Sequence, residues 1–463
     1  MRPGRAVVLV VALLMTLSAC GVRWTDAQRA DVLSRTRNVA AADLPAARGA
    51  STNGSSADAA APSSGEVTSA TVAGTTRAAG AISPTKAATA GRSLPCAAPS
   101  DAPGVTKEQI TIASISSRSG PVPGLGSSAA AAVRSYVAFR NATGGVCGRK
   151  LVLKEADDGT DSGRYRSLIT QLAPDVLGVA GGFALGDVGA VDLIEKANLP
   201  LVNVTSSDIV TAAPSVFDIN PPYANLDTVI GKYRYLHDHG ATKASVVYLA
   251  VDQSRAEAQN QERLMKAAGI AVVQVQELPV STLSYDSAAR SVANSGADYL
   301  LALLDTHGNV SMAQSMQDSG YKTKFSEYLV FAYATQFIDQ AGPAAEGATT
   351  WLRALPNEEA GGNPEMAAFV QWMDQVAPDD VRDTFAADSW TGAKAFLDAL
   401  QALPGPISRA ALVAQLKSVD SYDAGGMMGP IHLGPKHTEG CFIGMRVVSG
   451  QWRRMAPDHG YLC

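Results

Sequence analysis

Cysteine, aromatic residues and net charge are all low in this chain of 463 residues. It has five cysteines, 6% aromatic residues and a formal net charge of −5. A charge this small, without a basic cluster that carries interleaved aromatics, argues against nucleic acid as a partner. None of the cysteines shows C-x-x-C spacing, so we expect no metal site, and nothing in the sequence predicts a cofactor.

Motifs of catalysis and of nucleotide binding are also missing. The sequence contains neither a G-x-S-x-G elbow nor an H-E-x-x-H pair. His237 and His239 are two positions apart, which directs their rings to different sides of a helix. The stretch "GVAGGFALGDVG" follows a predicted strand, but it lacks the G-K-[ST] ending of a phosphate loop. We therefore expect that the protein is not an enzyme.

One long apolar run is present, at the amino end. The run "AVVLVVALLMTL" follows two arginines, and its length of about a dozen residues is too short to cross a ~30 Å hydrocarbon core. We predict a signal peptide over residues 1–20. It ends in Leu17-Ser18-Ala19-Cys20, which resembles the lipobox of bacterial lipoproteins. The resemblance implies lipidation of Cys20 and an anchor in the cell membrane, outside the cytoplasm; the alternative is ordinary cleavage with Cys20 incidental.

The next segment lacks the apolar bulk that a folded domain needs. Residues 21–95 are dominated by Ala, Ser, Thr and Gly, with Trp24 as their only aromatic. So little apolar surface cannot offset the entropy of ordering the chain. We predict a disordered tether that holds the folded part clear of the membrane.

The cysteines beyond Cys20 are four in number, and four is an even number in a compartment where disulfides persist. Three connectivities are open. We favour the pairs that are local in sequence, Cys96 with Cys147 and Cys441 with Cys463. The chain-entropy model gives them about 4 and about 3 kcal/mol. Cys147 would then fasten the start of the folded domain to the turn after its first helix.

Hydrophobic periodicity predicts strands and helices in alternation, which is typical of parallel-sheet units. The first series of strands is expected at 109–116, 150–157, 176–182 and 200–205. A second series is expected at 244–251, 271–278, 298–305 and 327–333, followed mainly by helices after Gly347 and a late β segment at 440–455. The pattern predicts an α/β fold with two Rossmann-like, doubly wound parallel-sheet lobes.

Several stretches together resemble the type I periplasmic binding proteins of the Leu/Ile/Val-binding class, the substrate-binding components of ABC importers. They are "ITIASISSRSGP", "FRNATGGVCGRKLVLKEADDG", "LPLVNVTSSD", "VFDINPP", "GPAAEGA" and the closing "GPIHLG" and "GQWRRM". The resemblance runs over about 105–455. It implies a small-molecule ligand, an ABC permease and ATPase as partners, and a monomer.

The same resemblance implies three hinge crossings between the lobes, near 220–223, 342–347 and 425–430. Lobe one would comprise 105–220 and 344–425, and lobe two 221–343 and 426–463. A ligand would be trapped between them by hinge closure.

The ligand site is expected on loops after the strands. In amino-acid binders of this class, a hydroxyl after the third strand and a Ser or Thr after the fourth receive the ligand carboxylate. Here the third loop, "GGFALGD", has no hydroxyl, and the lobe-two stretch "LVFAYATQF" has no acid for an ammonium. Unless Asp252 or Asp305 pairs the ammonium, we therefore expect a polar or amphipathic metabolite instead of a standard amino acid. The residues expected to contact it are Ser119, Phe183, Ser206, Ser207, Asp305, His307 and Tyr333.

Alternatives stay open for several of these residues. Core packing is the alternative for Phe183 and Tyr333, and helix capping is the alternative for Ser206 and Ser207. Two other functions also stay open, a sensor that signals to a membrane receptor and an envelope protein that binds no ligand.

Overall fold

The structure is a computed structural model, and it describes residues 94–120, 124–219 and 230–463. The expected signal peptide, Cys20, nearly all of the expected tether and the first expected crossing lie outside these residues. None of the helices in the described part is long and apolar enough to cross a bilayer.

Lobe one is built on a sheet of five parallel strands in the order β2-β1-β3-β4-β5. This is a doubly wound order, in which the direction of winding reverses between β1 and β3. The strands are β1 (Gln109–Ser116), β2 (Lys150–Asp157), β3 (Val179–Phe183), β4 (Leu201–Val204) and β5 (Val216–Asp218).

Helices cover both faces of this sheet, so that β1 is buried from its second residue onward. Apolar side chains of α3, α4 and α5 pack on one face, and those of α2, α11, α12 and α13 form the larger core on the other. The helices are α2 (Ser127–Ala142), α3 (Ser162–Leu172), α4 (Val191–Lys196), α5 (Asp208–Thr211), α11 (Pro364–Val376), α12 (Thr384–Gln401) and α13 (Arg409–Lys417).

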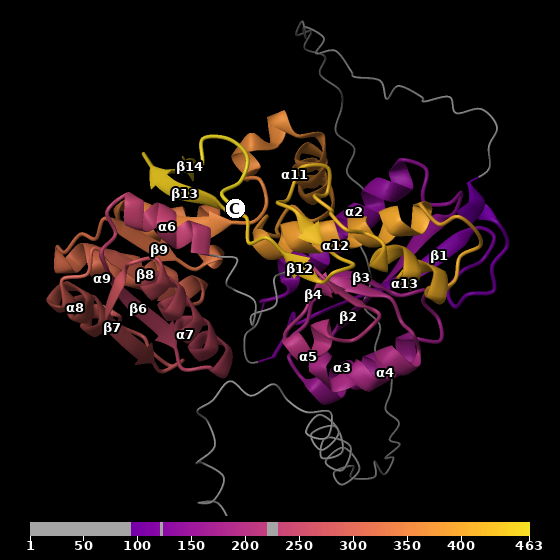
Figure 1. The fold of residues 1–463 in the computed structure, drawn as a ribbon, viewed down its shortest axis with the longest axis horizontal. Coiled ribbons are helices and arrows are strands. Elements are labelled where there is room, and N and C mark those ends of the chain that lie inside the picture. Colours follow the sequence, from indigo (N-terminus) through magenta and orange to yellow (C-terminus); the bar gives the residue numbers. More distant parts are fainter. Residues whose placement is uncertain (1–93, 121–123, 220–229) are drawn as a thin grey trace, which may run out of the picture. The chain divides into compact units, whose positions relative to one another are not determined.

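The central helix of this core, α12, lies against α2, β3 and β4 although it is distant from them in sequence (Figure 1). Its side chains Trp390 and Phe396 are fully buried. Gly181 in β3 permits the close approach of α12, and the adjacent Gly182 lets β3 lie close to β1. A Cβ on Gly181 would lie 2.5 Å from the Ser389 carbonyl oxygen, and one on Gly182 would lie 2.6 Å from that of Ile115. The diglycine of "GVAGGFALGDVG" therefore serves packing.

Lobe two is built on a seven-stranded sheet in the order β14-β13-β10-β9-β8-β6-β7. Strands β6 to β10 are parallel and repeat the winding order of lobe one, while β13 and β14 are antiparallel additions. The strands are β6 (Lys243–Leu249), β7 (Ala271–Leu278), β8 (Tyr299–Leu303), β9 (Phe325–Tyr328), β10 (Ala348–Leu352), β13 (Ile443–Val448) and β14 (Gln451–Ala456).

Two further cores cover the faces of this second sheet. Side chains of α6 and α7 form one core, and those of α8, α9 and α10 form the other. The helices are α6 (Ile230–Asp238), α7 (Asp252–Ala267), α8 (Asp286–Ser295), α9 (Thr306–Ser319) and α10 (Thr335–Ala341).

The second lobe boundary differs from the expected one. Residues from 344 onward were expected in lobe one, but β10 pairs with β9 and β13 and belongs to the sheet of lobe two. Most of its pairing is with β13, which lies far along the chain. The chain leaves lobe two only after Leu352, and the side chain of Arg353 already pairs with Asp388 of α12.

The third boundary differs in the same way. Residues from 426 onward were expected in lobe two, yet Met427, Met428 and Leu433 are buried in the core of lobe one. A short hairpin follows, of β11 (Ile431–His432) and β12 (His437–Thr438). Within its turn, Lys436 Nζ donates hydrogen bonds to the Thr211 and Ala213 carbonyl oxygens, at 2.8 and 2.5 Å. The return to lobe two therefore comes after this hairpin.

The two disulfides join Cys96 to Cys147 and Cys441 to Cys463, which is the sequence-local pairing. Beside the first, the buried guanidinium of Arg149 donates to the Cys96 carbonyl oxygen at 3.0 Å and to that of Thr106 at 2.6 Å. The bridge and the arginine together fix the start of the folded domain against the turn before β2.

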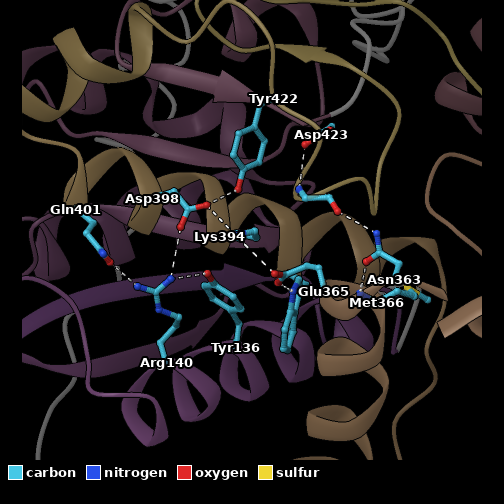
Figure 2. A network of polar contacts seen from close by, with 12 residues as sticks. Tyr136, Arg140, Asn363, Glu365, Met366, Lys394, Asp398, Gln401, Tyr422 and Asp423 are labelled. Carbon is cyan, nitrogen blue, oxygen red and sulfur yellow. Dashed lines mark hydrogen bonds and ion pairs between the residues drawn. The ribbon is translucent and has the colours of Figure 1, made fainter. Parts of the chain in front are cut away.

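A polar network ties the helices of lobe one together (Figure 2). Arg140 of α2 contacts Asp398 of α12 at 3.4 Å, and Asp398 also accepts from Tyr422 at 3.0 Å and from Lys394 at 2.8 Å. Lys394 lies 3.6 Å from Glu365 of α11. Since these groups are partly screened by solvent, the network orients the helices more than it stabilises them.

Removal of the first disulfide is expected to destabilise the protein strongly. The bridge spans 51 residues, so the double substitution Cys96→Ala/Cys147→Ala should lower the free energy of unfolding by about 4 kcal/mol. Denaturant unfolding measures the change. Cys441→Ala/Cys463→Ala, which opens a span of 22 residues, should cost about 3 kcal/mol, and a larger loss from this second pair would contradict the expected order.

Candidate functional site

The carboxyl ends of β1 to β4 bring together the four lobe-one residues that the sequence predicted. Ser119 follows β1, Phe183 ends β3, and Ser206 and Ser207 follow β4. The winding direction reverses between β1 and β3, where the Ser117 backbone N–H donates to the Phe183 carbonyl oxygen at 2.8 Å. Ligands of doubly wound folds bind at such a position.

Ser119 is exposed and is held by Asp157, the last residue of β2. Its hydroxyl donates to Asp157 Oδ2 at 2.6 Å, and its backbone N–H donates to Oδ1 at 3.2 Å. The backbone N–H groups of Arg118 and Gly159 donate to the same Oδ1, at 2.9 and 3.0 Å. Desolvation opposes ionisation of Asp157, but these hydrogen bonds outweigh it and hold its pKa well below the usual range.

Asp158 is fully buried and joins three of the loops. It accepts from the Ser117 hydroxyl at 2.7 Å, from the Gly186 N–H at 2.9 Å and from the Thr160 N–H at 3.1 Å. Asp157 and Asp158 therefore both act as acceptors for the loops that follow the strands.

Asp187 is a second fully buried carboxyl at this edge, in the loop after β3. It accepts from the Ser206 backbone N–H at 3.0 Å and from the Ser206 hydroxyl. Burial raises its pKa to about 7, aided by the nearby Asp218 and Asp158 charges and opposed by the Ser206 hydrogen bonds. Sequence reasoning missed this residue because it sought a hydroxyl in that loop.

Ser207 immediately precedes α5 but does not cap it. Its hydroxyl oxygen is buried and has no hydrogen-bond partner among the described residues. Next to it, Thr205 donates its hydroxyl to Asp218 Oδ2 at 2.6 Å and its N–H to Oδ1 at 3.3 Å. Helix capping, the alternative for Ser207, is absent, so its hydroxyl is open to another partner.

Phe183 lies in a small apolar cluster, where it is 4% exposed and stacks on Phe385 at a ring-centroid distance of 4.5 Å. Phe385 is on the first turn of α12, and its ring also lies 5.4 Å from that of Phe331, which follows β9 in lobe two. The three rings thus link the carboxyl edges of the two sheets. No local pattern in the sequence indicates Phe385, because only the tertiary fold places α12 beside β3.

The lobe-two candidates do not form a comparable group. Asp305 caps α9, accepting from the Gly308 N–H at 2.7 Å, and His307 is exposed on the first turn of that helix. Tyr333 is buried in the core beside Trp452, with ring centroids 5.8 Å apart. A ligand contact by any of the three stays a prediction.

Polar contacts join the second crossing to lobe two. The Tyr333 hydroxyl donates to Glu358 at 2.5 Å and accepts from the Asn357 N–H at 2.7 Å. Arg454 of β14 donates to both carboxylate oxygens of Glu359 at 2.6 Å. A small pocket lies at the crossings, lined by Ile219, Arg353, Met428, Gly429, Ile431 and Cys441, among others.

These groups are suited to binding. The hydroxyls of Ser119 and Ser206 donate to Asp157 and Asp187, and that of Ser207 has no partner among the described residues. Hydroxyls beside aromatic rings offer both a polar and an apolar surface to a small molecule.

Comparisons with known proteins agree with this geometry. The family model described as "Periplasmic binding protein" matches residues 109–451. Leu/Ile/Val-binding protein homolog 7 of Brucella melitensis is 25% identical over 368 residues, which cover 75% of this chain and 92% of the relative.

Solved structures of low sequence identity share the fold. A fatty acid ABC transporter substrate-binding protein from Thermomonospora curvata is 20% identical with a TM-score of 0.64, over 78% of this chain and 94% of that one. A leucine-binding protein from Thermotoga maritima is 15% identical with a TM-score of 0.60, over 75% and 98%. A solute-binding protein from R. palustris in complex with benzoate is 18% identical with a TM-score of 0.61, over 76% and 96%.

The pH dependence of stability tests the buried carboxyl of Asp187. Its pKa of about 7 lies above the roughly 4 of an unfolded aspartate. Between about pH 4 and about pH 7, Asp187 therefore holds a proton in the folded protein that it has lost in the unfolded chain. The contribution of this group to stability is complete below about pH 4 and is lost as the pH rises towards 7, by up to about 4 kcal/mol. Asp187→Asn should remove this component, as measured by urea unfolding across that range.

Ser206→Ala serves as the companion variant. It removes a hydroxyl donor that favours the ionised form, so it should move the pH-dependent range upwards. A profile that Asp187→Asn leaves unchanged would show that Asp187 is ionised in the folded protein throughout.

Proposed function

Because this chain belongs to the periplasmic binding protein family, we propose that it captures a small polar or amphipathic ligand between its two lobes and delivers it to an ABC importer. Members of this family are extracytoplasmic solute-binding proteins that work with ABC transporters, and they are not enzymes. The observation that carries the proposal is the group of hydroxyls and aromatic rings at the winding reversal of the lobe-one sheet.

The relatives support an amphipathic ligand without naming it. They include a leucine-binding protein, a fatty acid transporter substrate-binding protein and a benzoate complex, and each of these small molecules has a polar head and an apolar body. Phe183, Phe385 and Phe331 would provide the apolar surface for such a body, and Ser119 and Ser207 the polar contacts.

Hinge closure at the three crossings would enclose the ligand. The contact between Phe331 and Phe385 joins the two lobes beside the proposed site, so a ligand that inserts there would change their separation. Closure would also exclude water, which strengthens every polar contact inside.

The anchor and the assembly state belong to the same proposal. Lipidation of Cys20 would hold the protein at the outer face of the membrane, and residues 21–95 would allow it to reach the permease. The folded part would act as a monomer, since one chain supplies both lobes. Signalling to a membrane receptor is the alternative use of the same closure.

Ligand binding is tested by thermal shift across amides, short acids, amino acids, sugars and aromatics. A true ligand at 100 times its Kd should stabilise the protein by about 2.7 kcal/mol. Ser207→Ala should weaken binding by up to about tenfold, because its unpartnered hydroxyl is at the site.

Ser215→Ala is the matched control. Ser215 also has a buried hydroxyl without a partner among the described residues, but it precedes β5 at the opposite edge of the sheet. Equal weakening by both variants would argue against a site at the carboxyl edge. No stabilisation by any compound would count against ligand capture and favour a non-binding envelope protein.

Anchoring is tested by replacing the candidate lipidation site. Cys20→Ser should move the protein from the membrane fraction to the soluble extracytoplasmic fraction and abolish metabolic labelling with a fatty-acid probe. Membrane retention of Cys20→Ser at the level of the natural protein would contradict the lipid anchor.

A further inference from the structure

Resting on the proposed function, we infer that the ligand's hydrogen-bonding head is uncharged, a carboxamide or hydroxyl, and that Asp187 excludes carboxylates. The Ser206 N–H and hydroxyl could donate to the carboxylate of a ligand, but they donate to Asp187 of the chain instead.

Ser206 has two hydrogen-bond donors at the proposed site, its hydroxyl and its backbone N–H. A hydroxyl and a backbone N–H in the loop after a parallel strand form a favourable anion site. Here the Ser206 N–H donates to Asp187 Oδ2 at 3.0 Å, and its hydroxyl donates to Oδ1. Both donors are therefore satisfied internally. Asp187 is fully buried, so it is part of the wall behind Ser206 and is not displaced as a solvent ion would be.

Other donors at the same edge are satisfied in the same manner. The N–H groups of Ser119 and Gly159 donate to Asp157, at 3.2 and 3.0 Å. The Gly186 N–H donates to Asp158 at 2.9 Å, and the Thr205 N–H donates to Asp218 at 3.3 Å. To accept from these N–H groups, a ligand carboxylate would have to displace one of the aspartates and would then lie against the charge of the others, which is unfavourable at close range.

Apart from Arg118, what is left for a ligand at this edge is neutral. The Ser207 hydroxyl is buried without a partner, and it can donate to and accept from an uncharged head. The rings of Phe183 and Phe385 offer apolar contact beside it. The nearest competing feature is Arg118, whose Nε is buried without a partner among the described residues and which would favour a carboxylate.

Matched ligand pairs separate these possibilities. Benzamide with benzoate, and isovaleramide with isovalerate, differ only in the head group. Isothermal titration calorimetry of the full chain at about pH 8 should show each carboxamide binding at least about tenfold more tightly than its carboxylate. Asp187→Ser, which removes the internal carboxylate and frees Ser206, should reduce or reverse this preference.

Further variants keep the result interpretable. Asp187→Asn has nearly the same shape as the natural residue and replaces Asp187→Ser if the latter unfolds. Asp175→Asn changes the net charge equally, at a surface ion pair with Lys154, and should leave the preference unchanged.

Three outcomes would overturn the inference. If the carboxylates bind as tightly as their amides, the inference is wrong but ligand capture is not. If Arg118→Met then abolishes carboxylate binding, Arg118 is the residue that holds the carboxylate. A preference for amides that survives both Asp187 variants would remove Asp187 as its cause. If none of the four compounds binds to the natural protein or to any variant, the proposed function is overturned together with the inference.

Discussion

The proposed site depends on one constraint: the backbone N–H groups at the carboxyl edge of the lobe-one sheet all need hydrogen-bond acceptors. Loops that leave parallel strands cannot pair their first N–H groups within the sheet, and buried donors without acceptors are costly. Asp157, Asp158, Asp187 and Asp218 provide the acceptors here. Their oxygens fix the loop positions of Ser119 and Ser206, and their charge sets which head groups the edge can accept.

Close packing of α12 on the sheet is the complementary constraint. The helix approaches β3 at Gly181, and its first turn presents Phe385 to Phe183. One helix thus stabilises the core of lobe one and supplies an apolar wall of the proposed site. Arg353, at the second crossing, pairs with the buried Asp388 of the same helix, whose pKa is raised to about 7 by burial despite that cation. The start of the crossing is therefore fastened to the element that carries the aromatic contact.

The local sequence pattern predicted most of the parallel strands, but it failed for elements whose structure is determined by residues far along the chain. β1, β2 and β7 have the predicted bounds, because their β-branched runs are flanked by clear turn signals. β10 was missed because most of its pairing is with β13, almost a hundred residues later. Both later lobe boundaries were also mispredicted because contacts with residues far apart in sequence determine them. In the site, the serines after β1 and β4 were proposed from the family resemblance and from the loops that follow the strands, and their contact with a ligand stays a prediction. Asp187 was missed because a hydroxyl was sought in its loop, and Phe385 was missed because nothing local marks it.

The placement of α11 to α13 in lobe one also governs the order in which the chain can fold. The core of lobe one includes Ile110 near the start of the folded part and Leu433 near its end. Its contacts are therefore of very long sequence separation, and such topologies fold slowly. A nascent chain cannot complete this core until nearly all of it has been synthesised. Until then, the apolar faces of β1 and α2 lack the partners that α12 and α13 provide, so completion of the core is set by the last third of the chain.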